Sequence, residues 1–371
     1  MGRNVIILMI DGGRLDRALE SDAFGRLGSG SAFFSQPITY GPHTIAAMHA
    51  VFSGAYGCRT GTDSYWSTYR FKKDRFRTLP EYLHGLGYHT VADVVNELVI
   101  PRQGLDEFLV HDESKDDLSA RHAGLLERMA ARRDAGQGFF LYLQYSNIHT
   151  GIMNEVLKVY DNFSEEYFAD REGNRRRYDR LFSAAEVYLD EMLEKIRELG
   201  LDRDSLVLVM SDHGISTGEK VGERAYGAFC YDYTLRTFAY FVWPGISPVR
   251  VDRQVRTVDF MPTILDYLGI PASSDHEPMD GVSLMPLIRG EEAEELGAFS
   301  ETGNPLGGTR PPERPNTMSL RRHGWKLIIN EHDGTRELYN LESDPGEREN
   351  LAGTGLPEEE SLLKEIQRYV R

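Results

Sequence analysis

The feature that most constrains the fold is a run near the start of the chain, Asn4–Ile10, in which six successive residues are apolar. An extended segment that is apolar on both faces must be covered on both sides, as a central strand of a parallel sheet is. The run stops at Asp11, and comparable apolar runs recur at Phe139–Tyr145, 206–210 and 238–242. These runs predict buried strands of one sheet.

Segments with helical spacing lie between the predicted strands. The clearest covers residues 179–199, where apolar residues recur at the i, i+3, i+4, i+7 positions. Thr78 is placed to cap a helix over 79–86 that stops at Gly87, and a strand is expected at 89–95. Helices that alternate with buried strands predict a three-layer α/β/α sandwich with a mostly parallel central sheet.

The composition changes after Gly303, where glycine and proline crowd into a loop. Beyond it, Trp325–Asn330 and 337–339 have the pattern of short antiparallel strands, and 357–371 that of a terminal helix. We therefore expect a large α/β domain over residues 1–305 and a small antiparallel C-terminal subdomain over residues 306–371.

The charge of the chain limits its partners. It carries 42 Lys and Arg against 58 Asp and Glu, a net charge of −16, which opposes binding to nucleic acid or to anionic membranes. An anionic substrate fits only if a buried cation supplies local attraction. No apolar run is long enough for a membrane span or a signal-peptide core, and Cys58 and Cys230 cannot form a disulfide framework. We expect a cytoplasmic protein; these patterns carry no information on its oligomeric state.

Side chains that can bind a metal directly follow two of the predicted strands. Asp11 follows the first strand, and Asp212 and His213 follow the strand at 206–210. Ligands of open α/β sheets bind beyond the carboxyl ends of the strands, so these three side chains are expected to meet. Two carboxylates and an imidazole suit Zn²⁺ or Mn²⁺ best, with Ca²⁺ or Mg²⁺ as alternatives. We predict one divalent metal ion, which needs a further ligand.

A helix that begins near Thr44 offers that ligand. Pro42 ends an extended stretch, after which Ile45, Met48 and Phe52 fall on one side of a helix. The first turn of a helix has free N–H groups and a dipole that favour an anion. A threonine hydroxyl is a poor nucleophile at neutral pH, but coordination to a divalent cation lowers its pKa enough to generate an alkoxide. Thr44 is therefore a candidate nucleophile; an ordinary helix cap is the alternative.

These residues, taken with further motifs, resemble the sulfatase branch of the alkaline phosphatase superfamily. The motifs occur in order over nearly the whole chain, at residues 5–16, 44–56, 78–96, 139–149, 206–219, 258–269, 280–284, 325–328 and 337–345. The resemblance implies cleavage of sulfate or phosphate esters through a covalent intermediate. It makes Asp11, Asp212 and His213 metal ligands, and Thr44 both a ligand and the nucleophile.

The chain departs from the family pattern at two positions. Sulfatases of the main type convert a cysteine to formylglycine within Cys-x-Pro-x-Arg, whereas residues 44–48 read Thr-Ile-Ala-Ala-Met. Threonine cannot become formylglycine, and Cys58 lies outside the pattern. Gly12 stands where calcium-binding sulfatases carry a second aspartate. The chain is therefore similar to the single-metal phosphoethanolamine and phosphoglycerol transferases and to the threonine phosphodiesterases.

Three more residues are candidates for contact with the ester. His149 follows the strand at Phe139–Tyr145 and is expected to protonate the departing oxygen. Asn147 is a candidate donor to a non-bridging oxygen, and Lys220 a candidate for neutralising charge at the transferring group. The alternatives are a backbone hydrogen bond for His149 and a solvated position for Lys220.

The sequence thus predicts a metal-dependent hydrolase or transferase of phosphate esters that acts through a phosphothreonine at Thr44. Phosphodiesters or substituted phosphates are the preferred substrates. A sulfuric ester hydrolase with a nucleophile other than formylglycine is the second hypothesis, and a metal-stabilised binding protein without turnover is the third. The expected partner is an anionic small molecule, or an ester of a glycan or a lipid headgroup. Residues 151–177 are expected to roof the cleft and set specificity.

Overall fold

The computed structural model describes residues 4–64, 70–307 and 312–370. Within them, the centre of the fold is an eight-stranded sheet with the order β5-β4-β6-β1-β7-β8-β2-β9. Its strands are β1 (Asn4–Ile10), β2 (Ala32–Phe34), β4 (His89–Val94), β5 (Glu107–Val110), β6 (Phe139–Tyr145), β7 (Ser205–Ser211), β8 (Ala239–Val242) and β9 (Val249–Val251). Neighbours from β5 to β7 run parallel, whereas β8 is antiparallel to both β7 and β2. The mostly parallel sheet that the sequence predicts is confirmed.

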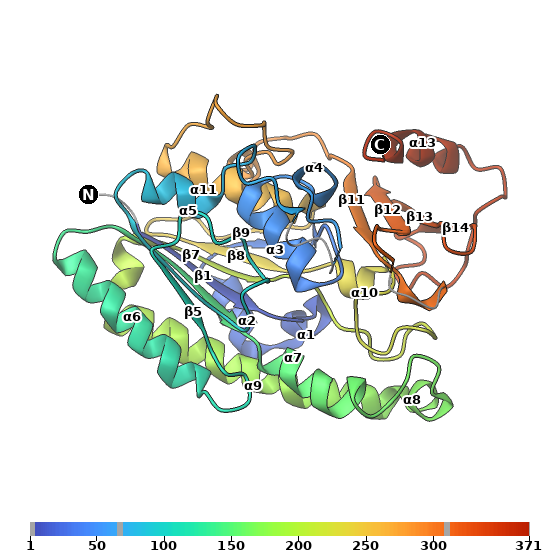
Figure 1. Cartoon of the computed structure of the whole chain (residues 1–371), viewed down its shortest axis with the longest axis horizontal. Helices are drawn as coiled ribbons and strands as arrows, with labels where there is room; N and C mark the ends of the chain where they lie inside the picture. Colours follow the sequence, from blue (N-terminus) through green and yellow to red (C-terminus); the bar gives the residue numbers. More distant parts are fainter. Residues whose placement is uncertain (1–3, 65–69, 308–311, 371) are drawn as a thin grey trace.

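Helices cover both faces of this sheet (Figure 1). One layer contains α1 (Leu15–Glu20), α2 (Asp22–Gly28), α6 (Leu118–Asp134) and α9 (Arg171–Glu198); the other contains α3 (Thr44–Ser53), α5 (Leu79–His84), α11 (Phe260–Leu268) and α12 (Met285–Ile288). Strand β1 shows the division, because Ile6 and Leu8 belong to the apolar cluster under α9 while Val5 and Ile7 belong to the cluster under α3. This alternation is the two-residue period of a strand. The predicted three-layer sandwich is confirmed.

Short elements connect these layers. They are β3 (Pro37–Ile38), α4 (Gly57–Thr60), α7 (Asn147–Ile152), a π-helical turn (Met153–Leu157), α8 (Glu165–Ala169), α10 (Asp232–Leu235), β10 (Val255–Arg256) and the 3₁₀ turns Leu201–Arg203, Thr257–Asp259 and Pro305–Gly307. Strands β3 and β10 pair in parallel as a separate two-stranded sheet.

Two helix boundaries differ from those that the sequence predicts. The helix that Thr78 caps has the reciprocal hydrogen bonds of a capping box with Glu81, but it ends at His84, before Gly87. Helix α9 begins well before residue 179, because the Asp170 side chain accepts a hydrogen bond from the Gly173 N–H at 2.9 Å and caps the helix there. The added turns are rich in arginine, so they carry no apolar stripe to mark them.

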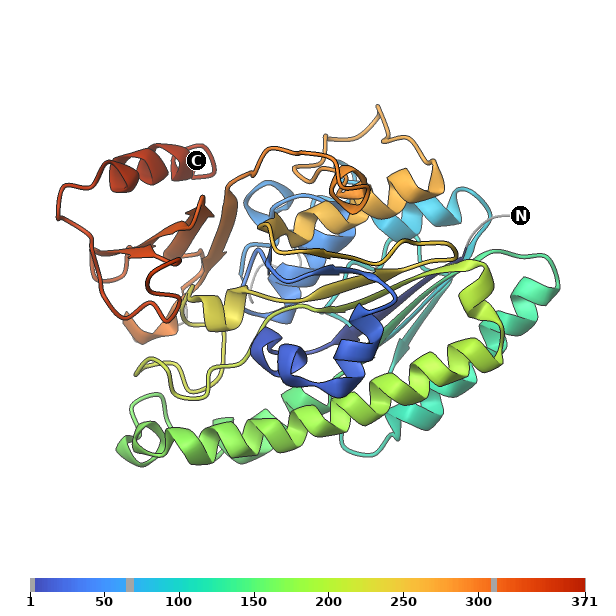
Figure 2. The same cartoon turned by 180° about the vertical axis from the view of Figure 1, so that it is seen from behind.

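The C-terminal part forms an antiparallel sheet at one end of the sandwich, covered by α13 (Pro357–Ile366) (Figure 2). Its strands, in spatial order, are β11 (Ala298–Thr302), β12 (Thr317–Arg322), β13 (Trp325–Asn330) and β14 (Thr335–Asn340). The sheet therefore starts before the predicted boundary at residue 305, and the division into two domains stays a prediction. Residues 308–311 of the predicted loop and Arg371 of the predicted helix lie outside the described residues.

This small sheet packs against the helix that carries Thr44. Ala46 and Ala50 of α3 share an apolar cluster with Phe299 and Leu320 of the sheet. The small alanine side chains allow the sheet to approach the helix closely, so the C-terminal part helps to fix the position of α3. None of the helices formed by the described residues is both long enough and apolar enough to cross a bilayer.

A buried carboxyl on β11 should make stability depend on pH. Glu301 is 6% exposed and accepts a hydrogen bond from the Tyr40 hydroxyl. Burial, reinforced by Asp63 and Glu331, raises the pKa of Glu301 to about 8 against the lowering effect of that hydrogen bond. The folded chain therefore keeps a proton that the unfolded chain releases at its ordinary pKa, and stability falls as the pH rises between these two values.

We expect Glu301→Gln, which cannot ionise, to lose less unfolding free energy between pH 5 and pH 8 than the unsubstituted protein. Urea denaturation at several pH values measures this difference. Glu172→Gln, at an exposed position on α9, is the matched control and should follow the unsubstituted protein. Identical pH dependence in all three proteins would contradict the assignment.

Candidate metal and catalytic site

The register of the central strands brings the predicted ligands to one edge of the sheet. Ile10 at the end of β1 pairs with Tyr145 of β6 on one side and with Ser211 of β7 on the other. Asp11 and Asp212 are the next residues of their strands, so their side chains emerge next to each other. This is the carboxyl edge of the parallel part of the sheet, where ligands bind in open α/β folds.

The structure brings the four predicted ligand side chains into contact distance. The Thr44 hydroxyl oxygen lies 3.5 Å from each carboxylate oxygen of Asp11 and 3.4 Å from Nε2 of His213. Nε2 of His213 lies 3.7 Å from Oδ1 of Asp11 and 3.5 Å from Oδ2 of Asp212. One ligand atom from each of Asp11, Asp212 and His213 lies within 4.8 Å of the others. We name this group the Asp11 cluster.

The electrostatics of the Asp11 cluster favour a cation. Asp11 is 1% exposed, and Asp212 and His213 are fully buried. Burial and the nearby Asp212 charge raise the pKa of Asp11 to about 6, against the lowering effects of His149, His213 and Gln144. Oδ2 of Asp212 is buried and accepts no hydrogen bond from any described residue. A divalent cation would relieve the repulsion between the carboxylates and fill this acceptor, so the residues present fit the metal that the sequence predicts.

Backbone groups hold the outer atoms of two ligands and leave the inner atoms directed into the cluster. Oδ1 of Asp212 accepts hydrogen bonds from the N–H groups of Gly12 at 3.1 Å and His213 at 2.9 Å. Nδ1 of His213 lies 2.8 Å from the Gly214 carbonyl oxygen, to which it can donate, so that Nε2 offers its lone pair to the cluster. Gly12 has a φ of +73°, and a Cβ there would lie 2.9 Å from Ile215, so glycine suits this turn.

Thr44 is the first residue of α3, as the sequence predicts. The residue that caps the helix is His43, whose Nδ1 accepts a hydrogen bond from the Ala46 N–H at 3.4 Å. Thr44 does not serve as the cap, and its hydroxyl is directed to the Asp11 cluster instead. The positive end of the helix dipole therefore lies beside the candidate nucleophile.

Gln144 is a site residue that the sequence analysis missed. Its Nε2 donates to Oδ2 of Asp11 at 2.7 Å, while its Oε1 accepts from the Val95 N–H at 3.1 Å. Both ends of the amide are thus held, which fixes the orientation of the Asp11 carboxylate. The sequence does contain a sign of this role: Gln144 is an amide side chain inside the otherwise apolar strand Phe139–Tyr145. A polar group buried in this way needs a hydrogen-bond partner.

His149 lies on α7, and its surroundings place it near the Asp11 cluster. Burial lowers the pKa of His149, but Glu113, Asp11 and Asp212 together raise it by more, so the net shift of the pKa is upward. Nδ1 of His149 lies 3.5 Å from Oε2 of Glu113. The ring of Tyr226 lies 5.9 Å from the His149 ring and 4.8 Å from the ring of His213. Glu113 was not identified from sequence, because nothing in the pattern joins it to His149.

Among the described residues, no hydrogen bond or ion pair joins Asn147 or Lys220 to the cluster. The Asn147 side chain is exposed and interacts with Tyr145. The Lys220 ammonium donates to the Glu347 carbonyl oxygen and lies 4.4 Å from the ring centre of Tyr231. Lys220 thus faces the C-terminal part of the chain, a direction that its spacing from the metal ligands could not reveal. The substrate contacts of both residues stay predictions.

A cavity of about 360 Å³ lies beside the cluster. His43, which precedes the nucleophile, and Tyr226, which packs on His213, both line it. The segment 151–177 contributes Met153 and Asn162 to its wall, which agrees with the predicted roof. This cavity is therefore a candidate place for an ester beside the Asp11 cluster.

The chain belongs to the sulfatase family, whose pattern it matches over residues 3–270. Among curated relatives, it is 29% identical to the choline-sulfatase of Rhizobium meliloti over 191 residues, which cover 49% of this chain and 34% of that protein. It is 27% identical to human arylsulfatase A over 287 residues, which cover 67% of this chain and 52% of that protein. The matches therefore span about a third to a half of these relatives.

Solved structures share the whole fold. A protein solved with its substrate D-glucosamine-2-N,6-O-disulfate gives a TM-score of 0.75 at 17% identity, with 100% of this chain and 98% of that chain covered. The phosphonate monoester hydrolase of Silicibacter pomeroyi gives a TM-score of 0.76 at 18% identity, with 99% and 95% covered. The predicted place in the sulfatase-like part of the alkaline phosphatase superfamily is confirmed.

We expect Gln144→Leu to weaken metal binding at the Asp11 cluster by about 10- to 100-fold, the usual cost of losing a partner behind a metal ligand. Calorimetric titration of metal-stripped protein with Mn²⁺ measures the affinity. Gln367→Leu, at an exposed position after α13, is the matched control and should bind as the unsubstituted protein does. Equal affinities for both variants would show that Gln144 does not orient a ligand.

Proposed function

We propose that this chain is a metal-dependent hydrolase or transferase of phosphate esters, with diesters or substituted phosphates preferred, in which Thr44 is the nucleophile. The observation that carries the proposal is the position of the Thr44 hydroxyl, 3.4 to 3.5 Å from Asp11 and His213 at the start of a helix. At this position the hydroxyl lies where a cation bound by Asp11 and His213 would also contact it.

Each residue of the cluster has a separate role in the first step, the attack of Thr44 on phosphorus. A divalent cation bound by Asp11, Asp212 and His213 would lower the pKa of the Thr44 hydroxyl and neutralise the non-bridging oxygens of the ester. Thr44 Oγ1 forms a bond to phosphorus in line with the bond to the departing oxygen, which breaks. The Thr44 hydroxyl proton leaves toward the Asp11 side, where a carboxylate oxygen lies 3.5 Å away.

His149 is the proposed general acid. Its raised pKa keeps more of the imidazole protonated near neutral pH, and Glu113 holds its Nδ1 side. The other ring nitrogen then donates to the departing alcohol oxygen. In the second step a water or an acceptor alcohol forms a bond to phosphorus while the bond from phosphorus to Thr44 Oγ1 breaks. The neutral imidazole accepts the proton of the incoming water or alcohol, and Thr44 Oγ1 takes back its proton from the Asp11 side. Whether water or alcohol arrives decides between hydrolase and transferase.

A sulfuric ester substrate is the second candidate, and the comparisons favour it specifically. The chain belongs to the sulfatase family, the relatives named above are sulfatases, and one structural neighbour was solved with a sulfated sugar. A sulfuryl group has the same tetrahedral shape and fits the same cluster. Threonine in place of the formylglycine cysteine favours the phosphate ester. Anionic esters of glycans or lipid headgroups are compatible with either substrate.

We expect Thr44→Ala to lower kcat by roughly 10³-fold or more, because it removes the atom that forms the covalent bond. Thr44→Ser should retain measurable turnover, and Thr354→Ala, at an exposed position, should be unaffected. The assay is a panel of aryl sulfate, phosphate monoester, phosphate diester and phosphonate substrates with Zn²⁺ or Mn²⁺ added back. Mass spectrometry of acid-quenched reactions should find the adduct on the peptide that contains Thr44.

Other outcomes of these assays would support a different function. Dominant sulfate turnover that depends on Thr44 would select the sulfuric ester hydrolase. No turnover and no adduct with either metal would favour a binding protein. Full activity in the Thr44→Ala variant would contradict the nucleophile itself.

For His149→Gln, we expect the loss to depend on the leaving group. Turnover of an alkyl ester should fall by about 10² to 10⁴, the usual contribution of general acid catalysis, since an alkoxide needs a proton to depart. Turnover of a 4-nitrophenyl ester should fall far less, because nitrophenolate leaves without one. Comparing kcat for the two esters measures the difference, and equal losses would show that His149 does not protonate the leaving group.

A further inference from the structure

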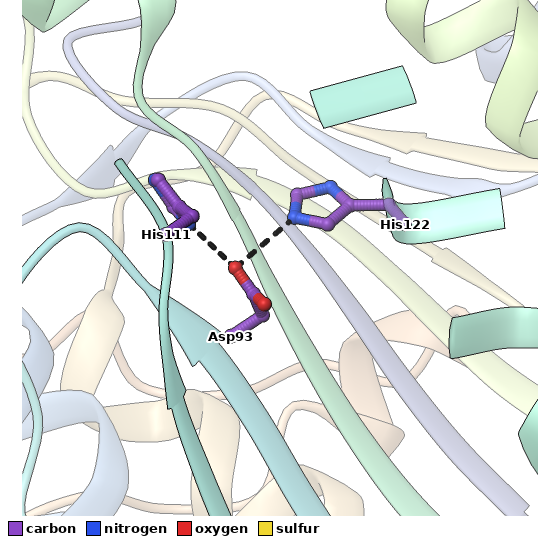
Figure 3. A group of neighbouring side chains, drawn as sticks. All are labelled: Asp93, His111 and His122. Atoms are coloured by element: carbon purple, nitrogen blue, oxygen red, sulfur yellow. Dashed lines mark hydrogen bonds and ion pairs between the residues drawn. The ribbon is translucent and has the colours of Figure 1, made fainter. Parts of the chain in front are cut away.

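A second group of metal-ligating side chains is formed by Asp93, His111 and His122 (Figure 3). Asp93 comes from β4, His111 follows β5 (Glu107–Val110), and His122 comes from α6. One ligand atom of each lies within 4.8 Å of the others. No residue is shared with the Asp11 cluster, and the proposed reaction uses none of the three.

Two imidazole nitrogens converge on a single carboxylate oxygen. Nδ1 of His111 lies 2.5 Å from Oδ1 of Asp93, and Nε2 of His122 lies 3.5 Å from the same atom. Dashed lines mark these two contacts in Figure 3. The second distance is beyond a good hydrogen bond. Nε2 of His122 is buried and hydrogen-bonds to no described residue. A polar atom that is fully buried and aimed into the group is therefore left to be satisfied.

Each of the three side chains is held from outside by a polar partner. Nε2 of His111 lies 2.9 Å from the Ser146 hydroxyl, and Nδ1 of His122 lies 2.7 Å from the Tyr188 hydroxyl. As the structure stands, Nδ1 of His111 donates to Oδ1 of Asp93. If a cation replaces that proton, the Ser146 and Tyr188 hydroxyls can accept from the outer ring nitrogens, so that the inner nitrogens bind the cation. Metal-binding histidines are typically held in this way by a partner on the second ring nitrogen.

The positive charge of Arg121 beside Asp93 opposes a bound cation less strongly than an unpaired arginine would. Nε of Arg121 donates to Oδ2 of Asp93 at 2.6 Å, which leaves Oδ1 for the interior of the group. The Arg121 guanidinium is also 3.4 Å from Asp116, and its side chain is 31% exposed. Its charge is thus shared between two carboxylates and partly solvated.

We propose that Asp93, His111 and His122 bind a second divalent transition-metal ion of the Zn²⁺ class. Two imidazoles and a carboxylate are an accepted ligand set for such ions, and a water can complete the coordination. The ion would tie together a strand, a loop and a helix. All three side chains are at most 2% exposed, so the task is structural.

This site would also affect the proposed reaction. His111 is two residues before Glu113, which pairs with His149. An ion that fixes the loop at His111 therefore fixes the partner of the proposed general acid. This consequence rests on the proposed function, whereas the metal site itself does not.

The first test counts metal ions. Metal-stripped protein is incubated with Zn²⁺, and unbound Zn²⁺ is removed by gel filtration. The number of zinc ions per chain is then measured by elemental mass spectrometry. We expect two Zn²⁺ per chain in the unsubstituted protein, one in Asp212→Asn, one in His122→Gln and none in the double variant. His84→Gln, at a half-exposed position on α5, is the matched control and should retain two. One ion in the unsubstituted protein that persists in His122→Gln would overturn the proposal.

The second test does not depend on the folding of a His122 variant. Asp212→Asn protein, in which the Asp11 cluster is impaired, is titrated with Co²⁺. We expect the visible d–d absorption of bound Co²⁺ to saturate at one ion per chain. Absence of this absorption would show that Asp93, His111 and His122 form a hydrogen-bonded network only, and would overturn the proposal even if the Asp11 cluster functions as described.

Discussion

The rest of the structure depends on two buried carboxylates that face each other at the ends of neighbouring strands. Asp11 and Asp212 are almost completely removed from water, and this burial, together with their mutual repulsion, raises the pKa of Asp11. Such a pair is stable only if it takes up protons or shares a cation. The hydrogen bonds that Gly12, His213 and Gln144 donate to these carboxylates keep the inner oxygens in place for a cation.

The fold supplies what this arrangement needs. Strand β1 is apolar on both faces and lies between β6 and β7, so Asp11 has no freedom to move away from the strand ends. Helix α3 is held by the central sheet on one side and by the C-terminal sheet on the other, through Ala46 and Ala50. The nucleophile therefore approaches the carboxylates on a fixed scaffold. Preorganisation of this kind is what catalysis at a charged transition state requires.

Sequence reasoning reached the layers of the fold and the four groups of the Asp11 cluster, because buried strands and strand-end carboxylates leave strong local patterns. It could not place Lys220, since the direction of a loop depends on contacts with Glu347 and Tyr231 that are distant in the chain. The same holds for Gln144 and Glu113, whose partners become neighbours only when the sheet forms. The start of α9 was missed for a different reason: its first turns are polar, and only the cap at Asp170 marks them.

The proposed chemistry requires one cation that is bound by groups from two strand ends and by the oxygen of Thr44. A crystal structure of the protein soaked with Zn²⁺ and vanadate, with the metal located by its anomalous scattering, tests this directly. We expect an anomalous peak about 2.0–2.2 Å from the ligand atoms of Asp11, Asp212 and His213, with Thr44 bonded to vanadium. A peak at other residues, or a Thr44 hydroxyl turned away from both metal and vanadate, would contradict it.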